Sequence, residues 1–123
     1  MNWWFVAAAG FTALVMLTHL VLGGREIARP LLAAERLDEV PRYTSYFCWH
    51  LVSIMQFGTA LAFWVAAVKP VSDYLALFAT GSVVLSMTWS LVMIAIFKLR
   101  VWHFPQWLLY VPPSVCGVVG LLA

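Results

Sequence analysis

Apolar residues dominate four stretches of the chain, and polar residues gather in the segments between them. The apolar stretches cover residues 3–23, 46–68, 71–97 and 104–123. Each is at least as long as the run of about 20 apolar residues that an α-helix needs to cross a bilayer. The pattern therefore predicts an all-α integral membrane protein, an antiparallel bundle of four transmembrane helices that forms a single domain over residues 1–123.

The segment between the first and second stretches is the longest polar connection. Within it, residues 30–40 mix apolar and charged side chains at helical spacing, and Pro30 and Pro41 stand at the two ends. This pattern is typical of a short amphipathic helix that lies in the membrane interface. The other two connections, residues 69–72 and 99–103, are short and therefore join antiparallel neighbours.

Composition supports the membrane assignment and excludes other classes of protein. Hydrophobic residues make up 64% of the 123 residues and charged residues only 10%, whereas a soluble domain has roughly 25% charged residues. The net charge is only +2, and the basic residues form no stripe along the chain. Nucleic acid is therefore excluded as a partner, and the lipid bilayer is the expected one.

Basic residues are divided unequally between the two ends of the predicted bundle. The connections after the first and third stretches lie at one end, and Lys69 lies at the other. Because short basic loops stay in the cytoplasm, we predict a bacterial inner-membrane protein with its long loop in the cytoplasm and both termini outside. Six basic residues lie at the predicted cytoplasmic end: Arg25, Arg29, Arg36, Arg42, Lys98 and Arg100.

Small residues recur at helical spacing in the third and fourth stretches. Ser82, Ser86 and Ser90 are four residues apart, and Gly117 and Gly120 are three apart. Small side chains let transmembrane helices approach closely. We therefore predict that both sets are packing residues, within the bundle or against a partner. A substrate path along the serines is the alternative.

Histidines fall toward one end of the predicted bundle. His19 lies near the end of the first stretch, His50 near the start of the second and His103 just before the fourth, so antiparallel helices place all three at similar depth. His19 and His50 would then hold the iron of haem b axially. With His103 and Glu26 added, the same residues would bind a transition metal. A hydrogen bond to a quinone or pigment, a proton relay, and a plain interfacial position are the other interpretations.

No catalytic motif accompanies these residues. The chain has no nucleophile–base pair, phosphate-binding loop, Cys-x-x-Cys pair or dinucleotide fingerprint, and no carboxylate lies in the interior of a predicted span. Gln56, deep in the second stretch, is predicted to bond to a neighbouring helix. We predict a non-catalytic accessory or assembly subunit of a larger membrane complex, energy-transducing or similar, bound to other subunits or to its own copies. A haem- or metal-binding redox protein and a small channel or transporter are the alternatives.

Overall fold

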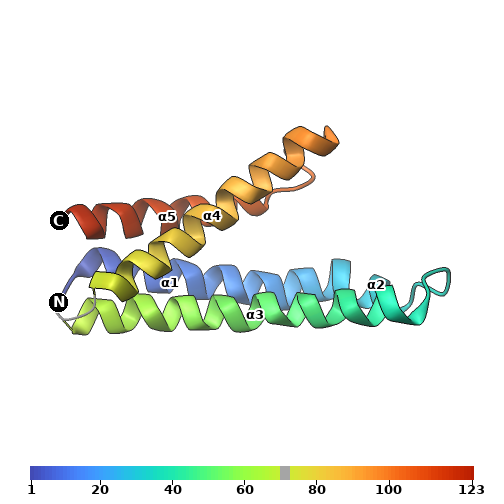
Figure 1. The fold of residues 1–123 in the computed structure, drawn as a ribbon, viewed down its shortest axis with the longest axis horizontal. Coiled ribbons are helices and arrows are strands. Elements are labelled where there is room, and N and C mark those ends of the chain that lie inside the picture. The colour runs from blue at the N-terminus through green and yellow to red at the C-terminus, as the bar shows by residue number, and fades with distance from the viewer. Residues whose placement is uncertain (70–72) are drawn as a thin grey trace.

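The chain folds into helices that pack as a bundle, as the computed structural model in Figure 1 shows for residues 1–69 and 73–123. The predicted all-α bundle of four helices is confirmed, and the first helix contains a π-helical segment that the sequence pattern did not predict. The elements are α1 (Trp3–Thr18), the π-helix η1 (His19–Ala28), α2 (Arg29–Leu32), α3 (Glu39–Val68), α4 (Asp73–Phe97) and α5 (Gln106–Leu122).

Three helices in the described part of the chain are long and apolar enough to cross a membrane. They are the continuous helix Trp3–Leu32 and α3, each with 30 residues, and α4 with 25. The fourth helix, α5, is apolar but has 17 residues, fewer than the usual run of about 20. The predicted start of the third span at Val71 lies outside the described residues, and α4 is described from Asp73 onward.

The predicted amphipathic helix over residues 30–40 is wrong. The first helix instead continues to Leu32, residues 33–38 form the turn, and α3 begins at Glu39. The polar connection is therefore much shorter than the sequence pattern indicates. Both long helices extend past the apolar stretches from which they were predicted.

The two prolines that suggested a bounded helix both fit inside longer ones. Pro41 lies in the first turn of α3, where the N–H groups have no partner within the helix. The N–H of Arg42, the next residue, donates to Asp38 O at 3.2 Å. Pro30 stands where η1 changes to α2, at the N-terminal end of the α-helical turn. Neither proline therefore ends a helix.

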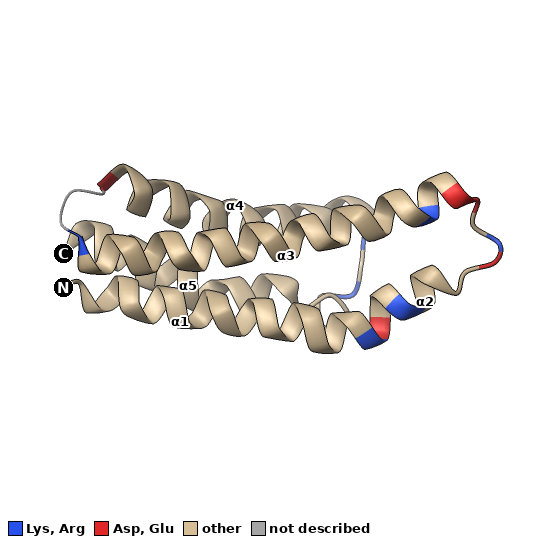
Figure 2. Cartoon of the chain, turned by 90° about the horizontal axis from the view of Figure 1, so that it is seen from below, with Lys and Arg blue, Asp and Glu red and all other residues tan. Residues whose placement is uncertain are grey.

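Charged residues gather at the two ends of the bundle, and most lie at one of them (Figure 2). The hairpin of the first helix and α3 projects beyond the α4–α5 turn and carries much of this charge. Lys69 and Asp73 lie at the other end, where they line one opening together with both termini, Met1 and Ala123. The bundle is therefore polarised along its length.

The buried core lies toward the end that holds the termini. Phe5, Phe63 and Cys116 pack there with alanines of α1, α3 and α4. Small side chains let the helices approach closely at this end. Away from it, α4 diverges from α1 and α3 (Figure 1). The divergence leaves the seam between α3 and α4 open along part of its length.

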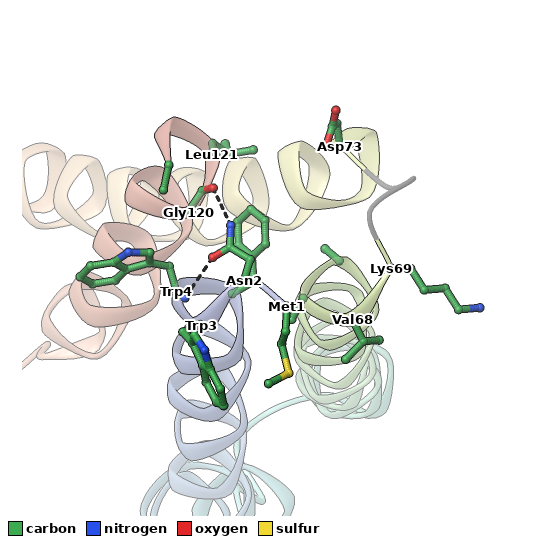
Figure 3. A pocket seen from close by; sticks show the side chains of 13 residues that line it. Met1, Asn2, Trp3, Trp4, Val68, Lys69, Asp73, Gly120 and Leu121 are labelled. Atoms are coloured by element: carbon green, nitrogen blue, oxygen red, sulfur yellow. Dashed lines mark hydrogen bonds between the residues drawn. The ribbon is translucent and has the colours of Figure 1, made fainter.

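Asn2 links the start of α1 to two other helices through hydrogen bonds, and Figure 3 shows the bonds of its side chain. Its backbone N–H donates to Ala67 O of α3 at 2.9 Å, and its side-chain Nδ2 donates to Gly120 O of α5 at 2.9 Å. Its Oδ1 accepts from the N–H of Trp4 at 3.0 Å and so caps α1. An opening of about 830 Å³ surrounds this clamp.

Asn2→Ala is expected to destabilise the bundle by about 1 kcal/mol, because it removes both side-chain bonds and leaves the backbone bond in place. Asn2→Asp keeps the acceptor that caps α1 but places a second acceptor against Gly120 O, so it should lose a similar amount. Equilibrium unfolding in mixed detergent micelles measures both variants. Wild-type stability in Asn2→Ala would show that the clamp does not hold the helices together.

The residue that follows α4 adopts the left-handed backbone conformation although it is not glycine. Lys98 has φ 52°, and Leu99 N–H donates to Ile94 O at 3.0 Å. This bond closes a Schellman motif, whose left-handed position is usually glycine. A side chain in this conformation costs roughly 1 kcal/mol, because its Cβ crowds the following carbonyl oxygen.

Lys98→Gly is expected to stabilise the protein by about 1 kcal/mol, since glycine adopts the left-handed conformation without that cost. Lys98→Ala removes the same charge but keeps the Cβ, so it should stay near the wild type. Thermal unfolding of the two variants under identical detergent conditions separates the effects. An equal gain in both variants would assign the stabilisation to the lost charge.

Candidate functional site

Four aromatic rings form a cluster where the first helix meets the N-terminal half of α3. We call His19, Tyr46, Trp49 and His50 the aromatic–histidine cluster. The rings of His19 and Trp49 stack, with centroids 4.3 Å apart and planes at 22°. His50 meets Trp49 edge-on at 5.0 Å and Tyr46 edge-on at 4.6 Å. Trp49 therefore contacts both histidines and joins them into one unit.

The hydrogen bond of His19 defines which of its ring nitrogens is free. Its Nε2 lies 3.1 Å from the backbone oxygen of Trp49. Because a carbonyl oxygen only accepts, Nε2 carries the hydrogen and Nδ1 keeps its lone pair. Metal-ligating histidines are commonly held in this way, with one nitrogen bonded to a carbonyl and the other on the metal.

Two glycines of η1 lie beside the indole of Trp49. A Cβ on Gly23 would lie 3.7 Å from Cζ2 of Trp49, and a Cβ on Gly24 would lie 3.8 Å from its Cη2. The indole therefore lies beside this part of η1, with space for a Cβ in ordinary van der Waals contact at either glycine. His19 is the first residue of this π-helical segment, and such segments are frequent at functional sites because they break the regular α-helical register.

A groove of about 390 Å³ adjoins the cluster between η1, α2 and α3. Tyr46, Trp49 and His50 line one side, and Arg25 and Arg29 of the first helix line the other. Guanidinium groups hold phosphate and carboxylate oxygens through paired N–H donors. The groove thus combines cationic and aromatic side chains at the charged end of the bundle.

The structure brings only two of the predicted metal ligands into this cluster, His19 and His50. His103 lies exposed in the α4–α5 turn, where its backbone N–H donates to Arg100 O at 2.9 Å. Glu26 is exposed on η1. No three His, Cys, Asp or Glu side chains within residues 1–69 and 73–123 are placed to hold a metal ion together. The predicted four-residue metal set is therefore wrong, because the divergence of α4 carries the turn with His103 away from α3 (Figure 1).

A second polar feature lies in the middle of the bundle. Gln56 of α3 donates from Nε2 to the hydroxyl of Tyr110 on α5 at 2.9 Å, which confirms the prediction that Gln56 bonds to a neighbouring helix. Both residues line a cavity of about 400 Å³ between α3 and α4. Sequence reasoning missed Tyr110, although a phenol in the interior of an apolar stretch is the same kind of signal as Gln56.

The predicted packing residues fall into two groups. Gly117 and Gly120 face side chains of other helices at short range, Thr80 and Phe63 for the first and Phe5 for the second. Ser82 and Ser86 line the cavity between α3 and α4 instead of a closed seam. Their hydroxyls donate to the carbonyls one turn earlier in α4, at 2.8 Å each. Ser90 is half-buried on the same helix.

Comparisons with protein-family models, with curated proteins and with solved structures find no match to this chain. The class of protein therefore rests on the fold and its surface. An all-α bundle with three candidate membrane spans defines a multi-pass membrane protein in contact with lipid.

Proposed function

We propose that the chain is a non-catalytic accessory or assembly subunit of a larger membrane complex. One stripe of α4 supports this proposal. Leu85, Trp89, Val92 and Ile96 repeat at spacings of four and three residues and are all exposed, Trp89 by 62%. That repeat is the pattern by which helices pack side by side. The subunit would act by packing this stripe against a helix of its partner.

The position of Trp89 along α4 favours a partner helix, and not lipid, as the neighbour of this stripe. Tryptophan favours the two membrane interfaces, where its N–H finds water. Trp89 lies about 12 Å along α4 from the helix end at Phe97, at 1.5 Å per residue. A large exposed indole at this depth is more stable against a neighbouring helix, because the helix buries the ring and supplies an acceptor for its N–H.

The test is the mass of the native particle extracted from its own membrane in a mild detergent. We expect the wild type in a complex with other chains, and Trp89→Ala in a smaller particle without them. Phe57→Ala, which changes a similarly exposed aromatic residue on α3, should leave the complex intact. A wild type that migrates alone or as a homo-oligomer would contradict the proposal.

We propose further that α5 completes a fourth crossing, with the charged hairpin in the cytoplasm of a bacterium and both termini outside its inner membrane. The 17 residues of α5 meet the lower limit of about 17 for a crossing. The basic residues gathered at one end support the orientation. In a variant without Cys48 and Cys116, a cysteine at position 123 should react with an impermeant maleimide in intact cells. A cysteine at position 34 should react only after permeabilisation, and the reverse result would invert the topology.

A second candidate function is cofactor binding at the aromatic–histidine cluster, with haem b or a metal ion held by His19 and His50. The orientation of His19 favours it, because Trp49 O holds Nε2 and leaves Nδ1 free to ligate. Optical spectra and metal analysis of the purified protein test this. We expect a bound cofactor that is lost in His50→Ala and kept in His103→Ala. Folded wild-type protein without haem bands or stoichiometric metal would exclude this function.

A further inference from the structure

The cavity between α3 and α4 is apolar at its mouth and polar at its inner wall. It lies between the middle parts of α3 and α4, and its volume is about 400 Å³. Exposed side chains of Leu51, Met55 and Leu85 line the mouth. Gln56, which is buried, and Tyr110 also line the cavity. An apolar molecule entering from the bilayer would therefore meet these two polar groups.

Gln56 carries a hydrogen-bonding atom that has no partner. The residue is only 6% exposed, and its Oε1 is buried without a hydrogen bond to any of the described residues. Exchanging the oxygen and nitrogen of the amide would not remove the problem, because Tyr110 satisfies only one of the two ends. A buried amide left half satisfied is costly, so this arrangement favours a ligand that supplies the missing bond.

The other hydroxyl groups around the cavity already donate their hydrogens to backbone carbonyls of their own helices. Thr12 donates to Ala8 O and Thr59 donates to Met55 O, both at 2.8 Å. Ser82 and Ser86 bond to their own helix in the same way. None of these hydrogens is available to Oε1 of Gln56.

The hydroxyl of Tyr110 complements the free oxygen of Gln56. It accepts the hydrogen bond from Nε2, and its own hydrogen is left to donate. The wall therefore offers one acceptor and one donor side by side. A hydroxyl group is the ligand group that satisfies both, since it donates through its hydrogen and accepts through its lone pairs.

We propose that this cavity binds an apolar molecule that carries one hydroxyl group, drawn from the lipid phase through the opening between α3 and α4. The hydroxyl donates to Gln56 Oε1 and accepts from Tyr110, and the apolar body fills the space beside Leu51, Met55 and Leu85. This site lies apart from the aromatic–histidine cluster, and of the stripe on α4 it uses only Leu85. Its failure would leave the accessory role untouched.

Three probes of one chain length test the site: dodecan-1-ol, its methyl ether and dodecane. The ether keeps the acceptor and loses the donor, and the alkane loses both. The concentration dependence of the thermal midpoint in nanodiscs gives the relative affinities. We expect the alcohol to bind about tenfold more tightly than the alkane, which corresponds to about 1.4 kcal/mol, with the ether in between.

The matched variant replaces both polar groups by apolar ones of similar shape, Gln56→Met with Tyr110→Phe. Without ligand it should be at least as stable as the wild type, because it removes the unsatisfied amide. It should bind the alcohol and the alkane equally. Thr88→Ala, which removes a hydroxyl bonded to its own helix outside the lining of the cavity, should keep the tenfold preference.

Two results would overturn the proposal. One is a wild type in which the three probes act equally, including the case in which none shifts the midpoint and the cavity holds only water. The other is a double variant that keeps the preference for the alcohol, which would place the recognition of the hydroxyl elsewhere.

Discussion

Gly117→Ala is expected to destabilise the bundle by about 2 kcal/mol, although it adds only one methyl group. The added Cβ would lie 2.7 Å from Oγ1 of Thr80 and 3.1 Å from Cζ of Phe63. Both neighbours are buried, Phe63 completely, so neither has room to move. The strain must therefore be relieved by separating α5 from α3 and α4.

Glycines elsewhere in the bundle provide the matched control. A Cβ on Gly58 or Gly81 would meet none of the described atoms within 4 Å. At both positions alanine should stabilise the helix by about 0.5–1 kcal/mol, because it lowers the conformational freedom of the unfolded chain. Equilibrium unfolding of the three alanine variants should give opposite signs. A loss at Gly58 as large as that at Gly117 would mean that general helix effects, and not the contact with Thr80 and Phe63, explain the result.

The sequence pattern predicts the helices well, because a helix that spans a membrane needs a long apolar run. Such a run remains recognisable even where it contains single polar residues. The four apolar stretches correspond to the four helical regions of the bundle. The helix ends are predicted less well. Pro30 and Pro41 were interpreted as boundaries, whereas each is accommodated near the start of an α-helical element. The missing N–H of Pro41 falls in the first turn of α3, which is as suitable a place for proline as a loop. Pro30 lies inside the continuous first helix, where η1 changes to α2.

The candidate site is only partly predictable, for a different reason. The spacing of His19 and His50 places them at one depth on any antiparallel pair of helices, and the structure joins them through Trp49. The sequence places His103 at the same depth along the bundle axis. Depth alone, however, does not give the lateral distance from His103 to His19 and His50. The angle of α4 to α3 decides that distance, and it depends on which small residues meet at the end with the termini. The hydrogen bond between Gln56 and Tyr110 depends on the same packing of the helices, which the sequence pattern does not give.

Trp49→Ala is expected to destabilise the protein by about 2 kcal/mol, because Trp49 is half-buried and its indole contacts three other rings. The indole stacks on His19, meets His50 and Tyr46, and lies beside Gly23. Removing it deletes these ring contacts between η1 and α3. Aromatic contacts of this kind add about 0.5–1.5 kcal/mol each beyond the area they bury.

Trp64→Ala is the control for this substitution, because Trp64 lies on the same helix and is about half exposed. It should change the stability by less than about 0.5 kcal/mol, as expected for an exposed position outside the buried core. Trp49→Phe should fall between the two, since a smaller ring keeps part of the stack on His19. Unfolding titrations in mixed micelles rank the three variants. Equal losses in Trp49→Ala and Trp64→Ala would mean that the cluster does not join η1 to α3. Its histidines would then lack the fixed geometry that cofactor binding requires.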